Sequence, residues 1–210
     1  MKVLIVGAAG PLGQELVREA LKHEHVVTAL VREGKQLTGM RDPHLTVTEG
    51  DVLRPGALDR PMAGQEAVIC SLGVKATRQK ISVLSDGTHN LMRAMQRHNV
   101  RRLLCITGIG AGNSRGHGGF LYNRLIQPFF LKTMYQDKDR QEKQVAGSGL
   151  DWMIIRPARL TNGKALNRFS VVQNMRGLQA GKISRADAAE WTIAQLETDK
   201  YLYRAVVLTE

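Results

Sequence analysis

The chain has 210 residues, of which 43% are apolar, and its mean hydropathy is −0.22. A chain of this length buries a full core in one domain, and this composition excludes intrinsic disorder and a collagen-like repeat. The 30 Lys and Arg residues outnumber the 19 Asp and Glu residues, which gives a net charge of +11 and a pI near 10.1. The basic residues are spread along the chain and only 5% of residues are aromatic, so small anionic ligands are favoured over nucleic acid.

The sequence also argues against a membrane-spanning segment, a disulfide framework and a metal site. No apolar run reaches the length of about 18 residues that a membrane span requires, and the N-terminal residues leave no room for a signal peptide. Cys70 and Cys105 lie in apolar runs and are expected to be reduced, structural thiols in a cytoplasmic protein. The six histidines show no metal-ligand spacing with a Cys or carboxylate partner, so no metal site is expected.

Short β-rich runs alternate with helical stretches along the chain. In chain order the predicted elements are strand 2–6, helix 12–22, strand 26–31, strand 45–48, strand 67–70, helix 81–98, strand 102–106, helix 121–146, strand 152–155, helix 185–196 and strand 205–208. Pro128 is expected to interrupt the first part of the helix over 121–146. Ser184 is expected to cap the last helix, with Asp187 three residues on.

The regular alternation predicts an α/β fold: a doubly wound, Rossmann-like parallel sheet with helices on both faces. The whole chain, residues 1–210, is expected to form a single NAD(P)-binding domain. In residues 161–182, Gly163, Gly177 and Gly181 interleave with polar residues. We therefore expect an irregular segment there, over the carboxyl edge of the sheet near the substrate, where ligands bind in this architecture.

A glycine motif follows the first predicted strand and opens the first predicted helix. Gly7, Gly10 and Gly13 stand at Gly-x-x-Gly-x-x-Gly spacing. The early glycines permit a tight turn and close backbone approach to a pyrophosphate, and Gly13 permits close packing of helix on strand. The helix N-terminus then offers free N–H groups to phosphate. The alternative is a tight turn that only packs the helix on the strand.

The end of the second strand is expected to choose the cofactor. NAD-binding folds usually place an acid there for the ribose 2′-hydroxyl, whereas this chain has Arg32. Its guanidinium suits a 2′-phosphate, and Lys35 adds a second charge, so NADP(H) is favoured over NAD(H). Glu33 is the competing acid. The alternative for Arg32 is a solvated surface charge.

Two later strand ends continue the pattern. Asp51, after the third strand, suits the adenine amino group, and Val52 is expected to pack on the adenine ring. Ser71, Leu72 and Gly73, after the fourth strand, are expected to run beside the ribose and diphosphate. The alternative for each is an ordinary loop residue without a ligand, but their order after successive strands favours a cofactor-binding site.

Together these residues resemble the atypical short-chain dehydrogenase/reductase group with an NmrA-like NAD(P)H-binding domain. Within that group the chain is most similar to the flavin reductase / biliverdin-IXβ reductase type, over essentially its whole length. The landmarks are Gly7 to Gly13, Val31-Arg32, Gly50-Asp51-Val52, Leu72-Gly73, Ser85-Asp86-Gly87 with Asn90, Thr107, Ser148-Gly149-Leu150, Arg156-Pro157 and Ile183-Ser184-Arg185-Ala186-Asp187.

The resemblance implies NADPH-dependent hydride transfer to a planar small-molecule acceptor such as FMN, FAD or a biliverdin-like linear tetrapyrrole. Leu84 is expected to line the nicotinamide side. With the residues argued above, the expected cofactor contacts are Gly7, Ala9, Gly10, Pro11, Leu12, Gly13, Arg32, Lys35, Asp51, Val52, Leu72, Gly73, Val74, Leu84, Thr107, Pro157 and Leu160.

Three candidate catalytic positions depart from that reductase type. Lys138 and Arg159 stand where it carries histidines, and Gly108 stands where it carries an active-site serine. We expect Lys138 to hold the nicotinamide ribose and stabilise negative charge on the reduced acceptor, and Arg159 to meet a phosphate or propionate. The alternatives are a surface lysine and a structural ion pair. Lys75, with Arg78 and Lys80, is a candidate basic rim.

The usual Tyr–Lys proton donor of short-chain dehydrogenases is absent at its spacing of four. Tyr122 is followed there by Ile126, whereas Tyr135 and Lys138 are three apart. Alcohol dehydrogenation is therefore disfavoured, while flavin reduction mainly requires two stacked rings.

Two alternative functions stay open. One is a non-catalytic NmrA-like sensor of NADP(H) redox state that binds a protein partner, which Gly108 favours. The other is a different small reductase or isomerase.

Overall fold

The computed structural model describes residues 1–32, 37, 39–75, 77, 79–117 and 131–210. The expected contributions of Glu33, Lys35, Arg78 and Tyr122 therefore lie outside the described residues, as does the first part of the helix predicted over 121–146.

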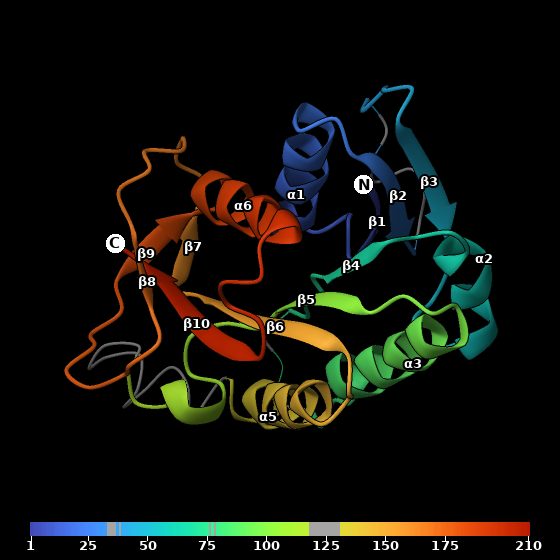
Figure 1. The fold of residues 1–210 in the computed structure, drawn as a ribbon. Coiled ribbons are helices and arrows are strands. Elements are labelled where there is room, and N and C mark those ends of the chain that lie inside the picture. Colours follow the sequence, from blue (N-terminus) through green and yellow to red (C-terminus); the bar gives the residue numbers. More distant parts are fainter. Residues whose placement is uncertain (33–36, 38, 76, 78, 118–130) are drawn as a thin grey trace.

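One eight-stranded sheet runs through the described chain, in the order β3-β2-β1-β4-β5-β6-β10-β8 (Figure 1). All its neighbouring pairs are parallel except β10 with β8. The strands are β1 (Lys2–Val6), β2 (Val26–Val31), β3 (Leu45–Glu49), β4 (Ala67–Cys70), β5 (Arg102–Ile106), β6 (Asp151–Pro157), β8 (Ser170–Val172) and β10 (Arg204–Thr209). The predicted doubly wound parallel sheet is confirmed.

Helices cover both faces of this sheet (Figure 1). On one face α1 packs against α6, and on the other α3 packs against α5. The α-helices are α1 (Pro11–Lys22), α2 (Asp59–Met62), α3 (Val83–Arg97), α5 (Lys132–Ala146) and α6 (Arg185–Ala194). Short 3₁₀ turns are η2 (Pro55–Leu58), η3 (Gly112–Ser114) and η5 (Gln195–Glu197). No helix of the described chain has the length and apolarity needed to cross a bilayer.

Strand β1 shows why the central strands are apolar on every residue. Val3 and Ile5 belong to the core under α1 and α6, whereas Leu4 and Val6 belong to the core under α3. Successive side chains of a strand point to opposite faces, and both faces are covered here. Cys70 and Cys105 are free, buried and directly opposite each other on β4 and β5, as expected of structural thiols.

The region predicted to be irregular, residues 161–182, contains a strand that the sequence analysis missed. Ser170–Val172 forms β8 and pairs antiparallel with β10 at the sheet edge. A small parallel sheet of β7 (Arg159–Thr161) and β9 (Lys182–Ser184) borders the same region. Three-residue strands are too short to show an alternating pattern, which is why they escaped prediction.

The predicted helix ends need smaller corrections. Helix α3 is shorter than 81–98, and α6 ends before 196, where η5 follows it. The predicted cap of α6 is confirmed, because the Ser184 hydroxyl accepts the backbone N–H of Asp187 at 2.9 Å.

Helix α5 is fixed to its neighbours by buried charges. The Asp137 carboxylate is fully buried and accepts the backbone N–H of Leu84, at 2.9 Å, and of Ser85, at 3.4 Å. These amides belong to the first turn of α3, where a negative charge is favourable. Five residues further along α5, Glu142 forms a buried bidentate ion pair with Arg156 of β6, at 3.0 and 2.7 Å.

Removing one member of this pair is expected to destabilise the fold strongly. Arg156→Met leaves the Glu142 carboxylate buried without its cation, a change that costs about 3–5 kcal/mol of unfolding free energy. Urea denaturation measures the loss. Arg101→Met, which breaks the exposed pair with Asp151, is the control and should leave the denaturation midpoint nearly unchanged. Equal effects of the two variants would contradict the assignment.

Candidate functional site

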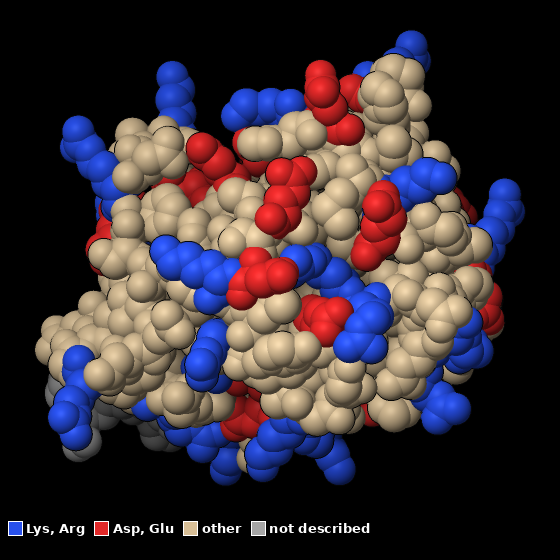
Figure 2. Space-filling model, viewed as in Figure 1, with Lys and Arg blue, Asp and Glu red and all other residues tan. Residues whose placement is uncertain are grey.

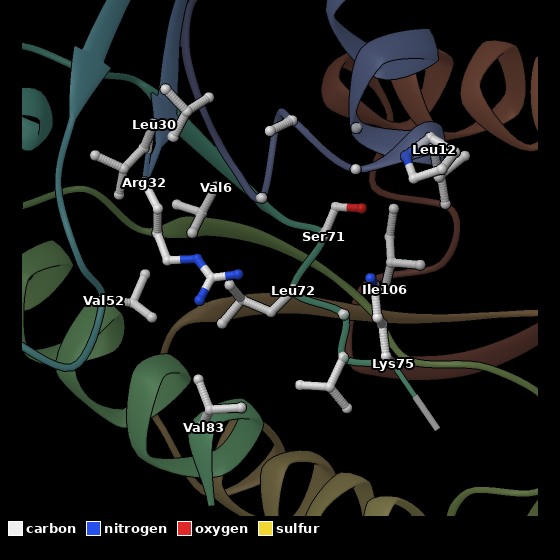
Figure 3. Close-up of a pocket in the computed structure, with 18 of the residues that line it drawn as sticks. Val6, Leu12, Leu30, Arg32, Val52, Ser71, Leu72, Lys75, Val83 and Ile106 are labelled. Atoms are coloured by element: carbon white, nitrogen blue, oxygen red, sulfur yellow. The ribbon is translucent and has the colours of Figure 1, made fainter. Parts of the chain in front are cut away.

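A pocket with a volume of about 570 Å³ opens at the carboxyl ends of β1, β2, β4 and β5 (Figure 3). It spans the point where the strand order reverses between β1 and β4, which is where doubly wound sheets bind ligands. The expected site residues that line it are Gly7, Ala9, Gly10, Pro11, Leu12, Gly13, Arg32, Asp51, Val52, Leu72, Gly73, Val74, Thr107, Lys138 and Leu160. The structure therefore brings together most of the residues that the sequence analysis selected from separate strand ends.

The turn between β1 and α1 requires glycine at two positions. Gly7 has a φ of +80°, and a Cβ there would lie less than 3.0 Å from the Ser71 carbonyl oxygen. A Cβ on Gly13 would lie less than 3.0 Å from the Gly7 oxygen and the Ala8 backbone. Gly7 thus lets the turn pass close to the end of β4, and Gly13 lets α1 approach β1.

The start of α1 is suited to an anion. Its N-cap residue, Gly10, offers no side chain to the first turn, and that turn carries no acidic residue. The N–H groups of the first turn therefore keep their partial positive charge facing the pocket. This arrangement fits the diphosphate of a dinucleotide.

Arg32 follows β2 directly and marks one end of the pocket. Figure 3 shows its guanidinium reaching into the pocket between Val52 and Leu72. The side chain is exposed and forms no ion pair with any residue that the structure describes. An uncommitted guanidinium with room around it can bind a phosphate through two parallel hydrogen bonds.

Val52 is held in place from α3. The Asn90 side chain donates a hydrogen bond of 2.9 Å to the Val52 carbonyl. A Cβ on Gly87 would lie 2.6 Å from the Val52 side chain, so glycine leaves the space that Val52 fills. The neighbouring Asp51 carboxylate accepts the N–H of Leu53 at 3.0 Å, which shapes the turn after β3.

Lys138 marks the other end of the pocket, beside the end of β5. Its Nζ donates a hydrogen bond of 2.6 Å to the Thr107 carbonyl, and the Thr107 hydroxyl donates to Glu142 at 2.6 Å. Burial lowers the pKa of Lys138 to about 8, while the nearby Glu142 carboxylate and Cys105 act in the opposite direction. Lys138 is therefore part of the pocket wall, and its interpretation as a surface lysine is wrong.

The NAD(P)H-binding family model matches residues 7–199. The chain belongs to the NAD(P)H-binding family. This membership confirms the cofactor class that the glycine turn indicated, and the resemblance to the atypical short-chain dehydrogenase/reductase group.

Known proteins resemble this chain in sequence or in fold. It is 28% identical to the uncharacterized sugar epimerase YhfK of Bacillus subtilis, over 100% of this chain and 94% of that protein. The structure of ChuY, an anaerobilin reductase from Escherichia coli O157:H7, superposes with a TM-score of 0.85 at 19% identity, covering 100% of this chain and 97% of the other. The structure of a short-chain dehydrogenase/reductase of Veillonella parvula in complex with NADP superposes with a TM-score of 0.84 at 18% identity. The match covers 100% of this chain and 94% of the other.

Four of the expected site residues do not line this pocket. Leu84 is buried in the first turn of α3, where its N–H is bound by Asp137. Pro157 is buried at the end of β6, and its carbonyl accepts the N–H of Ile109. Gly108 lies behind Lys138, and Arg159 is exposed on β7 without an ion pair to any described residue. These residues were selected by their position along the chain, which does not show where a side chain points.

Some residues that line the pocket were missed or given no role. Arg185, at the start of α6, lines it and donates a hydrogen bond to the Asn162 side chain. The sequence did not indicate this position by a strand end, because β9 escaped prediction, although Arg185 belongs to the landmark stretch 183–187. Lys75, expected as part of a rim, lies in the wall near Ile106 (Figure 3). The other wall residues to which no role was given are Val6, Leu30, Val31, Gly50, Leu53, Val83 and Ile106.

Tyr135 does approach Lys138, although the spacing of three differs from the usual one. The Lys138 Nζ lies 5.1 Å from the centre of the Tyr135 ring. The Tyr135 hydroxyl is buried and donates to the Ile109 carbonyl at 2.7 Å. Its proton is therefore committed to the backbone, and Tyr135 does not reproduce the tyrosine acid of alcohol dehydrogenases.

Two broader features concern other ligand classes. Within the described ranges, no group of three or more His, Cys, Asp and Glu side chains could hold a metal ion. On the face shown in Figure 2, Lys and Arg side chains are interleaved with Asp and Glu around the surface. On this face the distribution differs from the single basic stripe typical of nucleic-acid-binding proteins.

The close backbone approach at Gly13 gives a direct test of the turn. Gly13→Ala forces a methyl group against backbone atoms and is expected to cost about 1–3 kcal/mol of unfolding free energy, as overpacking does. The same variant should bind NADPH more weakly, because the turn must move. Gly56→Ala, where a Cβ meets open space, is the control. Thermal melting and NADPH titration of both variants check this, and a Gly13→Ala protein that matches Gly56→Ala would contradict it.

Proposed function

We propose that this protein is an NADPH-dependent reductase that transfers hydride to a planar acceptor, such as a flavin or a linear tetrapyrrole. One observation carries the proposal. A single pocket joins an anion-binding helix start to Arg32, which has no ion pair to a described residue, at one end and to the half-buried Lys138 at the other. The first two features suit a phosphorylated dinucleotide, and the third supplies positive charge at the reacting end.

The cofactor preference rests on Arg32. The family binds NAD(P)H, and Arg32 is the feature of this chain that favours the form with a 2′-phosphate. Val52 and Leu72 flank the guanidinium and provide apolar surface for the adenine ring (Figure 3).

The residues around Lys138 are proposed to act on the acceptor side. When bound, NADPH supplies the hydride. The Lys138 ammonium stabilises the negative charge that the acceptor gains, because a fixed cation in a partly buried site interacts strongly with developing charge. Thr107 holds the ammonium in position through its carbonyl. The pocket needs no tyrosine acid for this reaction, in agreement with the committed hydroxyl of Tyr135.

The comparisons support a reductase without naming the acceptor. ChuY is described as an anaerobilin reductase and shares the whole fold. YhfK is described as an uncharacterized sugar epimerase, and an epimerase of the short-chain dehydrogenase type would need a free tyrosine acid. We therefore favour reduction over epimerisation.

A second candidate function is a non-catalytic sensor that binds NADP(H) and a protein partner. Gly108 favours it, since this position offers no hydroxyl to order an acceptor or relay a proton. The two functions differ in turnover, so the same enzyme assay separates them.

Turnover is measured as loss of reduced-nicotinamide absorbance with excess FMN. We expect oxidation of NADPH well above a blank without enzyme, and slower oxidation of NADH. A panel with FAD, a quinone and biliverdin extends the test to other planar acceptors. Binding of NADPH without turnover on any of them would overturn the reductase proposal and favour the sensor.

Arg32→Ala is expected to weaken NADPH binding by roughly ten- to a hundredfold, because a charge-assisted contact is lost. NADH binding should change little, since NADH has no 2′-phosphate. Fluorescence titration with each cofactor gives both dissociation constants. Arg93→Ala, on the exposed side of α3, is the matched control. An unchanged preference for NADPH over NADH would show that Arg32 does not recognise the 2′-phosphate.

A further inference from the structure

Lys138 lies at the end of the pocket opposite Arg32. Arg32 follows β2 and Lys138 is bound to the residue after β5, with β1 and β4 between these strands in the sheet. A dinucleotide that crosses the reversal point with its adenosine half at Arg32 has its nicotinamide half on the β4 and β5 side. This placement rests on the cofactor-binding part of the proposed function.

Gly108 creates the space that the ammonium occupies. A Cβ at this position would lie only 3.1 Å from the Lys138 Nζ, and the φ of Gly108 is +143°. A side chain at 108 would therefore crowd the ammonium, which would have to shift by a few tenths of an ångström, and it would strain the backbone at this φ. The missing side chain at 108 and the lysine at 138 are two halves of one arrangement.

The surroundings of Lys138 contain charges of both signs. Glu142 and Cys105 face it from α5 and β5, and the Tyr135 ring lies beside it. Both oxygens of Glu142 are already bound by Arg156, so the carboxylate is shared with a second cation. Lys75 and Arg185 line the same pocket and add positive charge. The nicotinamide end of the pocket is therefore positive when Lys138 is protonated.

We infer that the Lys138 ammonium, held in the space left by Gly108, makes the pocket bind reduced nicotinamide cofactor more tightly than oxidised cofactor. The oxidised ring carries a positive charge and the reduced ring is neutral, while the rest of the molecule is the same. Two like charges in a partly buried site repel each other with little screening by water. The pocket thus distinguishes the two redox states by charge alone.

This selectivity has a consequence under either function. In a reductase it favours binding of the cofactor that donates hydride and release of the oxidised product. In a sensor it provides the difference in affinity that a redox signal requires. By reciprocity, oxidised cofactor must favour the neutral form of Lys138 as strongly as the ammonium disfavours oxidised cofactor.

The test measures the dissociation constants of NADP⁺ and NADPH by calorimetry at about pH 6.5 and about pH 9.5, on either side of the Lys138 pKa of about 8. Because both cofactors carry the same phosphates, phosphate titration cancels in the ratio of the two constants. In the wild-type protein we expect NADP⁺ to bind about tenfold more weakly than NADPH at the lower pH. The ratio should fall at the higher pH, where Lys138 loses its proton.

Three variants isolate the charge. Lys138→Met should show the low ratio at both pH values, and Lys138→Arg should keep the high ratio at both. Lys143→Met, on the exposed side of the same helix, should behave as the wild type does. If thermal melting shows that Lys138→Met is unfolded, the inference is still tested by the ratio of the two dissociation constants in the wild type and in Lys138→Arg at both pH values.

The outcomes separate this inference from the proposed function. Equal binding of the two cofactors at the lower pH, or a ratio that Lys138→Met leaves unchanged, overturns the inference alone. Failure of both cofactors to bind the folded wild-type protein overturns the cofactor assignment itself.

Discussion

The structure depends on how helix α5 buries charge. Its buried residues include Asp137, Gln141 and Glu142, and its apolar contribution to the core is small. Each buried carboxylate has a specific partner: Asp137 binds the first turn of α3, and Glu142 binds Arg156 of β6. Burying a charge is costly unless hydrogen bonds and an opposite charge compensate it. The orientation of α5 is therefore set by these partners, and that orientation points Lys138 into the pocket.

The same constraint links the fold to the site electrostatically. Glu142 accepts hydrogen bonds from both Arg156 and the Thr107 hydroxyl, and the Thr107 carbonyl holds the Lys138 ammonium. Thr107 is therefore bound to both Glu142, which fixes α5 on the sheet, and Lys138, which lines the pocket. A change in this network alters both stability and the charge at the nicotinamide end, so the two effects must be measured separately in any variant.

The parts of the fold that follow simple patterns could be predicted from the sequence. The central strands are apolar on every residue because both faces are covered, and Gly7 and Gly13 are needed where backbones nearly touch. Most of the pocket followed from strand ends meeting at one edge of the sheet. Strand β8 could not be predicted in this way, since its three residues are held by pairing with β10 rather than by a pattern of their own. Helix α5 was predicted as an element, but its inward face is polar and gave no hydrophobic stripe from which to orient Lys138.

The orientation of the side chains also explains which of the expected site residues do not line the pocket. Arg159 and Lys138 were both selected as cations in places where related reductases carry histidines. Only Lys138 reaches the pocket, because the charge pairs of α5 turn it inward, whereas Arg159 lies exposed on a two-stranded sheet. Gly108 does not line the pocket, but it leaves room for a residue that does, since a Cβ there would lie 3.1 Å from the Lys138 ammonium. The glycine at 108 is therefore best interpreted together with Lys138, whose ammonium lies where a side chain at 108 would crowd it. Here the absence of a side chain at 108 leaves room for the Lys138 ammonium, and the ammonium adds a positive charge to the wall of the pocket.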